Sequence, residues 1–101
     1  MNRIELRAWL AARRPTPPAV LRAHLDARLG DAPDTLPLAD QLACLGQRFL
    51  ARVSASSAAG RELALDLLAA DALVTYAFEA QAEADVSELA ALAARVTQCA
   101  T

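Results

Sequence analysis

Few side chains in this 101-residue sequence are of types that carry chemistry, and they lie far apart along the chain. His24 is the only histidine, and Cys44 and Cys99 are the only cysteines. Zinc sites need clustered Cys and His ligands, and di-iron bundles need several carboxylates with histidines at short spacings on facing helices. His24, Cys44 and Cys99 are a scattered, incomplete set, so the sequence predicts no metal site and no cofactor. We expect His24 to be a partly exposed residue on the shoulder of a helix.

Nucleophilic catalysis is not predicted either, because a reactive Cys or Ser needs a neighbouring base held by a third group. Cys44 lies beside the apolar stripe of its expected helix, which is typical of a small buried residue. Ser54, Ser56 and Ser57 fall in an expected linker without a flanking motif, and the three glycines are too dispersed for a phosphate loop. The prediction is a non-enzymatic protein with no catalytic residues.

The expected compartment is the cytoplasm. The opening segment, MNRIELRAWLAARR, carries Glu5 among its apolar residues and lacks the uninterrupted apolar core of a signal peptide. The most apolar stretch, residues 63–80, is interrupted by three acidic residues, so no membrane-spanning helix is predicted. In a reducing cytoplasm, we expect both cysteines to be free thiols.

Two acidic pairs, Glu62/Asp66 and Glu79/Glu83, have members one helical turn apart. A carboxylate pair can take part in acid–base chemistry or bind a cation, but no partner acid is identifiable here. Because charged residues are mostly exposed, we expect both pairs to lie on solvated helix faces.

All ten basic residues are arginine, and they gather toward the start of a chain whose net charge is −2. Residues 1–30 hold six arginines and two acids, whereas residues 31–101 hold four arginines and ten acids. Arg3, Arg7 and Arg14 share one side of the expected first helix, at spacings of four and seven, and are candidate partner-binding residues. They could contact phosphates, or pair with acids of this chain or of a partner. A nucleic-acid-binding module is therefore the alternative function, disfavoured by a proline-rich turn and an acidic chain.

The sequence predicts an all-α fold, a compact bundle of four to five short helices forming one domain over residues 1–101. Hydrophobic residues make up 55% of the chain, dominated by Ala and Leu with few β-branched residues, which favours helices over strands. The expected helices span residues 3–13, Pro17 to a stop at Gly30, 37–53, 58–82, and Asp85 onward.

Capping residues support several of these expected helix starts. Asn2 with Glu5, and Asp85 with Glu88, have the spacing of capping boxes, and Thr16 can cap the second helix.

The expected third helix carries a core-facing stripe with spacings of four, three, four and four: Leu38, Leu42, Leu45, Phe49 and Val53. Gly46 lies within this helix and marks either a close helix crossing or nothing.

The expected fourth helix is apolar on most of its circumference, which is typical of a central helix or of a helix in an oligomer interface. The preferred function is a small interaction or accessory protein that acts through protein–protein contacts as a two-fold homodimer. The fourth helix would lie at or next to the interface, with Leu67 and Val74 as candidate contact residues. A third possibility is a binder of small apolar ligands, with a pocket between helices.

Overall fold

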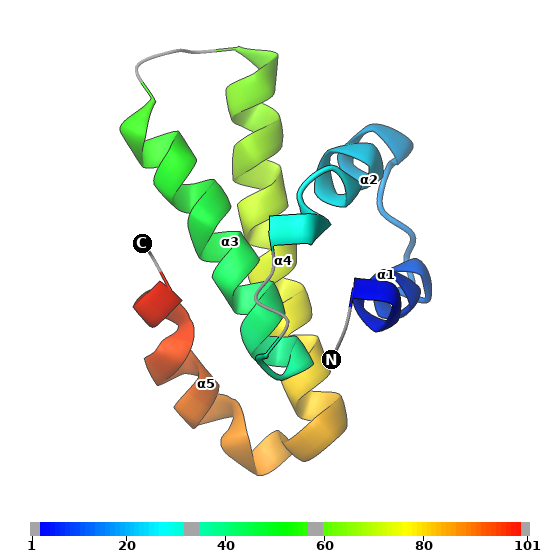
Figure 1. Cartoon of the computed structure of the whole chain (residues 1–101), viewed down its shortest axis with the longest axis vertical. Helices are drawn as coiled ribbons and strands as arrows, with labels where there is room; N and C mark the ends of the chain where they lie inside the picture. Colours follow the sequence, from blue (N-terminus) through cyan, green and yellow to red (C-terminus); the bar gives the residue numbers. More distant parts are fainter. Residues whose placement is uncertain (1–2, 32–34, 57–59, 100–101) are drawn as a thin grey trace.

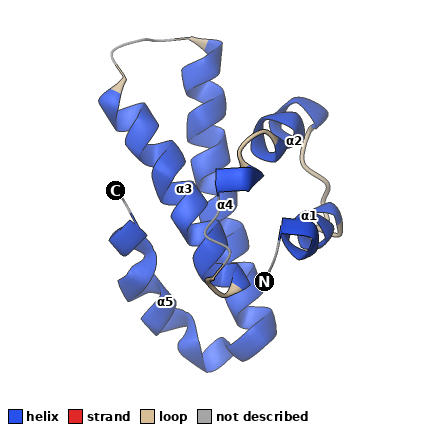
Figure 2. Cartoon of the chain, viewed as in Figure 1, coloured by secondary structure: helices blue, strands red, loops and turns tan. Residues whose placement is uncertain are grey.

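Two long antiparallel helices form the centre of the chain, and the shorter helices pack around them (Figure 1). In this computed structural model, α3 spans Leu38–Ala55 and α4 spans Arg61–Asp85, and they make the most extensive helix–helix contact. The structure describes residues 3–31, 35–56 and 60–99. Every regular element in those ranges is helical (Figure 2), so the all-α prediction is confirmed.

The remaining helices lie on two sides of this central pair. On one side are α1 (Arg3–Ala11), α2 (Ala19–Asp26) and the short 3-10 helix η1 (Leu29–Asp31). After α4, the chain turns through η2 (Val86–Glu88) into α5 (Leu89–Arg95) and η3 (Val96–Cys99), and η3 packs on α3. The Cα radius of gyration is 13.0 Å, as expected for a compact domain of about 100 residues.

The core forms where the leucine stripes of the short helices meet α3 and α4. The predicted stripe of α3 is buried at its centre, and Leu73 of α4 is inaccessible to solvent. The largest buried apolar side chains are Leu6, Leu10, Leu25, Leu29, Leu42, Leu45, Phe49, Leu73 and Leu92. The expectation of a central fourth helix therefore holds, although Leu67 and Leu68 of that helix remain about half exposed.

The start and end of α2 differ from the prediction. The helix begins at Ala19, with Pro18 at the N-cap position and no side-chain cap, so Thr16 does not cap it. The reason is local, because Pro17 itself precedes a proline, and that position disfavours the α conformation. The helix ends at Asp26, and Gly30 instead lies within η1.

Two further capping predictions have different outcomes. Asp85 ends α4 and caps η2, where its Oδ1 accepts hydrogen bonds from the backbone N and the Oγ of Ser87. Its expected partner was Glu88, so the cap is confirmed but its partner is corrected. Asn2 lies outside the described residues.

Gly60, at the N-cap of α4, has φ +117°, a conformation that glycine adopts far more readily than other residues.

Gly46 marks a close crossing of α3 and α4, which is one of the two interpretations that the sequence left open. A Cβ atom built at this position would lie 2.8 Å from Cγ2 of Val74 and 3.3 Å from the carbonyl oxygen of Ala70. The absent side chain thus allows the two central helices to approach each other closely.

Candidate functional site

A polar cluster around the buried Asp66 joins α2, α3 and α4. Nε2 of His24 lies 2.7 Å from Oδ1 of Asp66, whose carboxylate accepts a hydrogen bond from the imidazole. Nη2 of Arg52 lies 3.4 Å from the same oxygen. The side chain of Asp66 is only 8% exposed, so the expectation of a solvated face is wrong for this residue. Burial of a carboxylate is costly without partners, and here two partners on neighbouring helices supply the compensation.

Two further side chains complete the surroundings of His24. Its ring lies 5.5 Å from the ring of Phe49, centroid to centroid, in a tilted arrangement. Glu62 lies one turn before Asp66, and one ligand atom of each of His24, Glu62 and Asp66 lies within 4.8 Å of the others. His24 was expected to be partly exposed on the shoulder of its helix. Its side chain is 14% exposed, so it is partly exposed, but the expectation did not include its contact with Asp66. His24, Glu62 and Asp66 are therefore close enough together to hold a cation.

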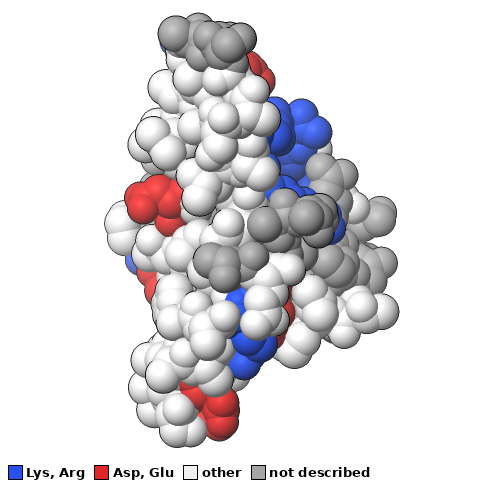
Figure 3. Space-filling model, turned by 90° about the vertical axis from the view of Figure 1, so that its left-hand side faces the viewer, with Lys and Arg blue, Asp and Glu red and all other residues white. Residues whose placement is uncertain are grey.

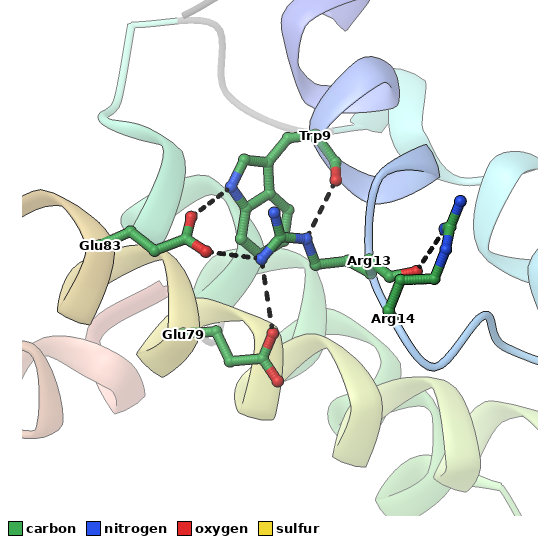
Figure 4. Close-up of polar contacts among 5 residues, drawn as sticks. All are labelled: Trp9, Arg13, Arg14, Glu79 and Glu83. Carbon is green, nitrogen blue, oxygen red and sulfur yellow. Dashed lines mark hydrogen bonds and ion pairs between the residues drawn. The ribbon is translucent and has the colours of Figure 1, made fainter.

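The second acidic pair holds α1 against the end of α4 (Figure 4). Oε1 of Glu83 accepts a hydrogen bond from the indole nitrogen of Trp9 at 3.0 Å, and its Oε2 accepts one from Nη1 of Arg13 at 2.8 Å. Nη1 of Arg13 also lies 3.7 Å from Glu79, and its guanidinium stacks 3.7 Å over the Trp9 ring. The hydrogen bond from Arg13, followed by that from Trp9, lowers the pKa of Glu83. Glu79 and Glu83 are exposed, as expected, but they serve to anchor α1.

Tyr76 packs beside this cluster, with its ring 6.0 Å from that of Trp9 in an edge-to-face arrangement. Burial raises the pKa of its phenol, and the nearby Glu79 adds to this shift. The aromatic pair is a packing contact between α1 and α4, and it gives α1 an apolar anchor beside its polar one.

Two of the three candidate arginines, Arg7 and Arg14, have side chains that the structure describes. Arg7 and Arg14 are both exposed, and Nη1 of Arg14 also donates to the backbone carbonyls of Ala11 and Arg13 at 3.3 and 2.8 Å. The side chain of Arg3 lies outside the described part of the chain. On the side of the molecule drawn in Figure 3, the arginines of the described residues form separate groups between wide uncharged areas. Nothing in this arrangement strengthens the nucleic-acid alternative, which stays a prediction.

The cysteine prediction needs a correction. Cys44 is buried, as expected, but it is disulfide-bonded, so the expectation of a free thiol is wrong. The second cysteine of the sequence, Cys99, lies at the end of η3, the element that packs on α3. Spacing along the chain carries no pairing information by itself, which is why the sequence could not reveal that Cys44 is bonded. Disulfides persist mainly in oxidising compartments. The bonded Cys44 therefore gives no support to the expected cytoplasmic location, which stays a prediction.

An apolar surface lies on one side of the α3–α4 pair. It is a shallow groove of about 330 Å³, which we call the Leu67 face; its residues are Gly46, Gln47, Leu50, Leu67, Ala70, Asp71 and Val74. Leu67 is 52% exposed and Leu50 is 41% exposed. The structure therefore brings the two predicted contact residues, Leu67 and Val74, onto one surface and adds Leu50, which the sequence analysis missed. Leu50 lies one position past the core-facing Phe49, and only the packing of α3 shows that it faces solvent.

A second apolar hollow lies on the other side of α4. Its volume is about 480 Å³, and its lining includes Val20, Leu21, Arg61, Leu65 and Leu68. Leu68 is 54% exposed, so adjacent leucines of α4 reach two different surfaces.

A larger surface hollow, of about 700 Å³, lies between α1, the start of α3 and the α4–α5 junction. Trp9 and Leu38 contribute apolar lining, while Glu5, Asp40 and Arg95 are among its charged lining residues, and Arg95 is paired with Asp40 at 3.0 Å. This mixed lining gives no particular support to an apolar-ligand site, which also stays a prediction.

Comparison with known proteins finds no family model, curated protein or solved structure that matches this chain. Within the part of the chain that is described, no helix combines the length and apolar character needed to cross a membrane.

Proposed function

We propose that this protein is a small non-enzymatic interaction protein that associates with a second copy of itself through the Leu67 face. The observation that carries the proposal is the exposure of Leu67 and Leu50, at 52% and 41%, beside a groove floored by Gly46 and Ala70. Exposed apolar side chains that gather around one groove are typical of protein contact surfaces, whereas singly scattered ones occur on any protein surface.

The shape of the Leu67 face favours a second copy as the partner. Two leucine side chains project next to a valley whose floor consists of small residues, Gly46 and Ala70. Helices pack by placing the ridge of one into the groove of the other. A surface that carries both a ridge and a groove can meet its own copy about a two-fold axis, which buries the same residues in both protomers.

The total surface of the chain indicates what kind of dimer this would be. Its accessible surface is 5730 Å², close to the roughly 5500 Å² that general scaling gives for a folded monomer of this mass. The core is therefore already covered within one chain. A specific interface of standard size needs about 800 Å² per partner, so we expect a non-obligate dimer whose monomer stays folded.

Leu67→Glu tests the proposal, with Leu68→Glu as the matched control. Both changes place the same charge at adjacent, half-exposed positions of α4, but only the first lies on the Leu67 face. An unpartnered charge buried in an apolar interface is costly, so Leu67→Glu should yield a monomer in light scattering while Leu68→Glu remains dimeric. Far-UV circular dichroism should show unchanged helix content in both variants.

The reverse result would contradict the proposal. If Leu68→Glu dissociates the dimer and Leu67→Glu does not, the interface lies on the hollow next to Val20 and Leu21. If neither variant dissociates a dimer, the contact surface lies elsewhere.

A further inference from the structure

We propose that His24, Glu62 and Asp66 form a binding site for a divalent transition-metal ion of the Zn²⁺ type. This site is separate from the Leu67 face, with which it shares no residue. The inference therefore stands or falls independently of the proposed dimer.

The backbone places these three ligands together. Glu62 and Asp66 are four residues apart on α4, a spacing that puts their carboxylates on the same helix face. His24 lies in the last turn of α2, and its Nε2 meets Asp66 at 2.7 Å. One ligand atom from each side chain lies within 4.8 Å of the other two.

Only small movements would convert this arrangement into a coordination sphere. Ligand bonds of 2.0–2.2 Å in a tetrahedral site set ligand atoms roughly 3.4 Å apart. The 2.7 Å contact between His24 and Asp66 must therefore open by about 0.7 Å. Nε2 must also give up its proton, to solvent or to Nδ1 of the same ring, before it can bind the metal. Glu62 is exposed and can swing inward without disturbing the core.

The donor set indicates the class of ion. Neutral imidazole suits zinc and the later first-row metals, whereas magnesium and calcium prefer oxygen ligands throughout. Two carboxylates supply two negative charges, which a divalent cation neutralises. Three protein ligands leave a fourth tetrahedral position, which water occupies in zinc sites of this kind.

Arg52 is the group that opposes the metal. Its Nη2 lies 3.4 Å from Oδ1 of Asp66, so its positive charge competes with a bound cation for the same carboxylate and would repel that cation. The contact is longer than that of His24, and the Arg52 side chain is 35% exposed, so it can withdraw toward solvent. This competition makes a signed prediction, because removing the arginine charge should strengthen metal binding.

Calorimetric titration of the metal-free protein with Zn²⁺ is the direct test, with Co²⁺ absorption as a spectroscopic probe of the coordination. We expect one ion per chain and weaker binding at acidic pH, because protons compete for the ligands. His24→Gln and Glu62→Gln should each lower the affinity at least about tenfold, since loss of an outer-shell partner alone can cost that much. Arg52→Gln should raise the affinity.

Glu88→Gln is the matched control for net charge, because Glu88 is exposed on η2 and outside the cluster. Its affinity for Zn²⁺ should equal that of the wild type. No saturable binding by the wild type, or equal affinities in the wild type, His24→Gln and Glu62→Gln, would overturn the proposal. Unchanged or weaker binding by folded Arg52→Gln would overturn the geometry, because the arginine would then support the site rather than compete for it.

Discussion

Gly46→Ala is the perturbation whose effect depends most directly on how α3 crosses α4. In an isolated helix, this change would add stability, by about 1 kcal/mol of helix propensity. In this structure, the new methyl group would lie 2.8 Å from Cγ2 of Val74 and 3.3 Å from two backbone atoms of α4. Overpacking of this kind typically costs 1–3 kcal/mol, so we expect a net loss of about 1 kcal/mol.

The coupling to Val74 makes the prediction specific. Val74→Ala removes the atom at 2.8 Å, so the nearest remaining contacts are the two backbone atoms at 3.3 Å. In that background, Gly46→Ala should be neutral or slightly stabilising, which corresponds to a coupling free energy of about 1 kcal/mol, within the range seen for residues in contact. Val74 cannot simply rotate away at no cost, because β-branched side chains have one strongly preferred rotamer in a helix.

Urea denaturation followed by circular dichroism, at protein concentrations low enough to keep the chain monomeric, measures these differences. Gly30→Ala is a control, because a Cβ atom at Gly30 meets no described atom within 4 Å. Full stabilisation by Gly46→Ala alone, with no coupling to Val74, would refute the close crossing of the two helices.

Three further predictions follow from single contacts. Phe49→Ala should lower the free energy of unfolding by about 3–5 kcal/mol, measured by urea denaturation, because Phe49 is only 2% exposed; a loss near zero would mean that α3 presents another face to the core. Glu83→Gln should lower stability at neutral pH by about 0.2–1 kcal/mol, as for other exposed ion pairs. The pKa of Glu83 is lowered in the folded protein. The stability difference between the wild type and Glu83→Gln should therefore be present above the unfolded pKa of about 4.3 and vanish as the pH falls through the folded pKa. A stability difference that does not depend on pH would contradict this prediction. Cys44 should resist alkylation in denaturant until a reductant is added, because it is disulfide-bonded; labelling without reductant would show a free thiol.

The elements were largely predictable because hydrophobic periodicity is a local signal. The stripe through Leu42, Leu45 and Phe49 identified α3 and its buried face, and the structure bears this out. The fourth helix runs to Asp85 rather than to residue 82, and α5 begins at Leu89, after η2, rather than at Asp85. The errors at the two ends of α2 arose where prolines or glycines compete for a boundary. Three prolines before Ala19 delay the start of α2, and Gly30 falls in a 3-10 turn after the helix has ended.

The polar cluster could not be predicted, because it depends on how helices pack. Glu62 and Asp66 are visible as a pair one turn apart, but His24 is 42 residues from Asp66 and on another helix. Nor does the sequence show that Asp66 is buried while its neighbour Leu67 is half exposed. These two residues are adjacent on α4, and only the placement of α2 and α3 against that helix decides which of them is covered.

Self-association is the central claim, and the mass of the wild-type protein in solution as a function of concentration tests it most directly. Light scattering should show a mass rising from the 10.7 kDa monomer toward twice that value as concentration increases, with a midpoint of about micromolar order for a non-obligate interface of standard size. A mass that stays at 10.7 kDa up to roughly a hundred times that concentration would contradict the account, because an interface weaker by 2.7 kcal/mol is not a specific dimer surface.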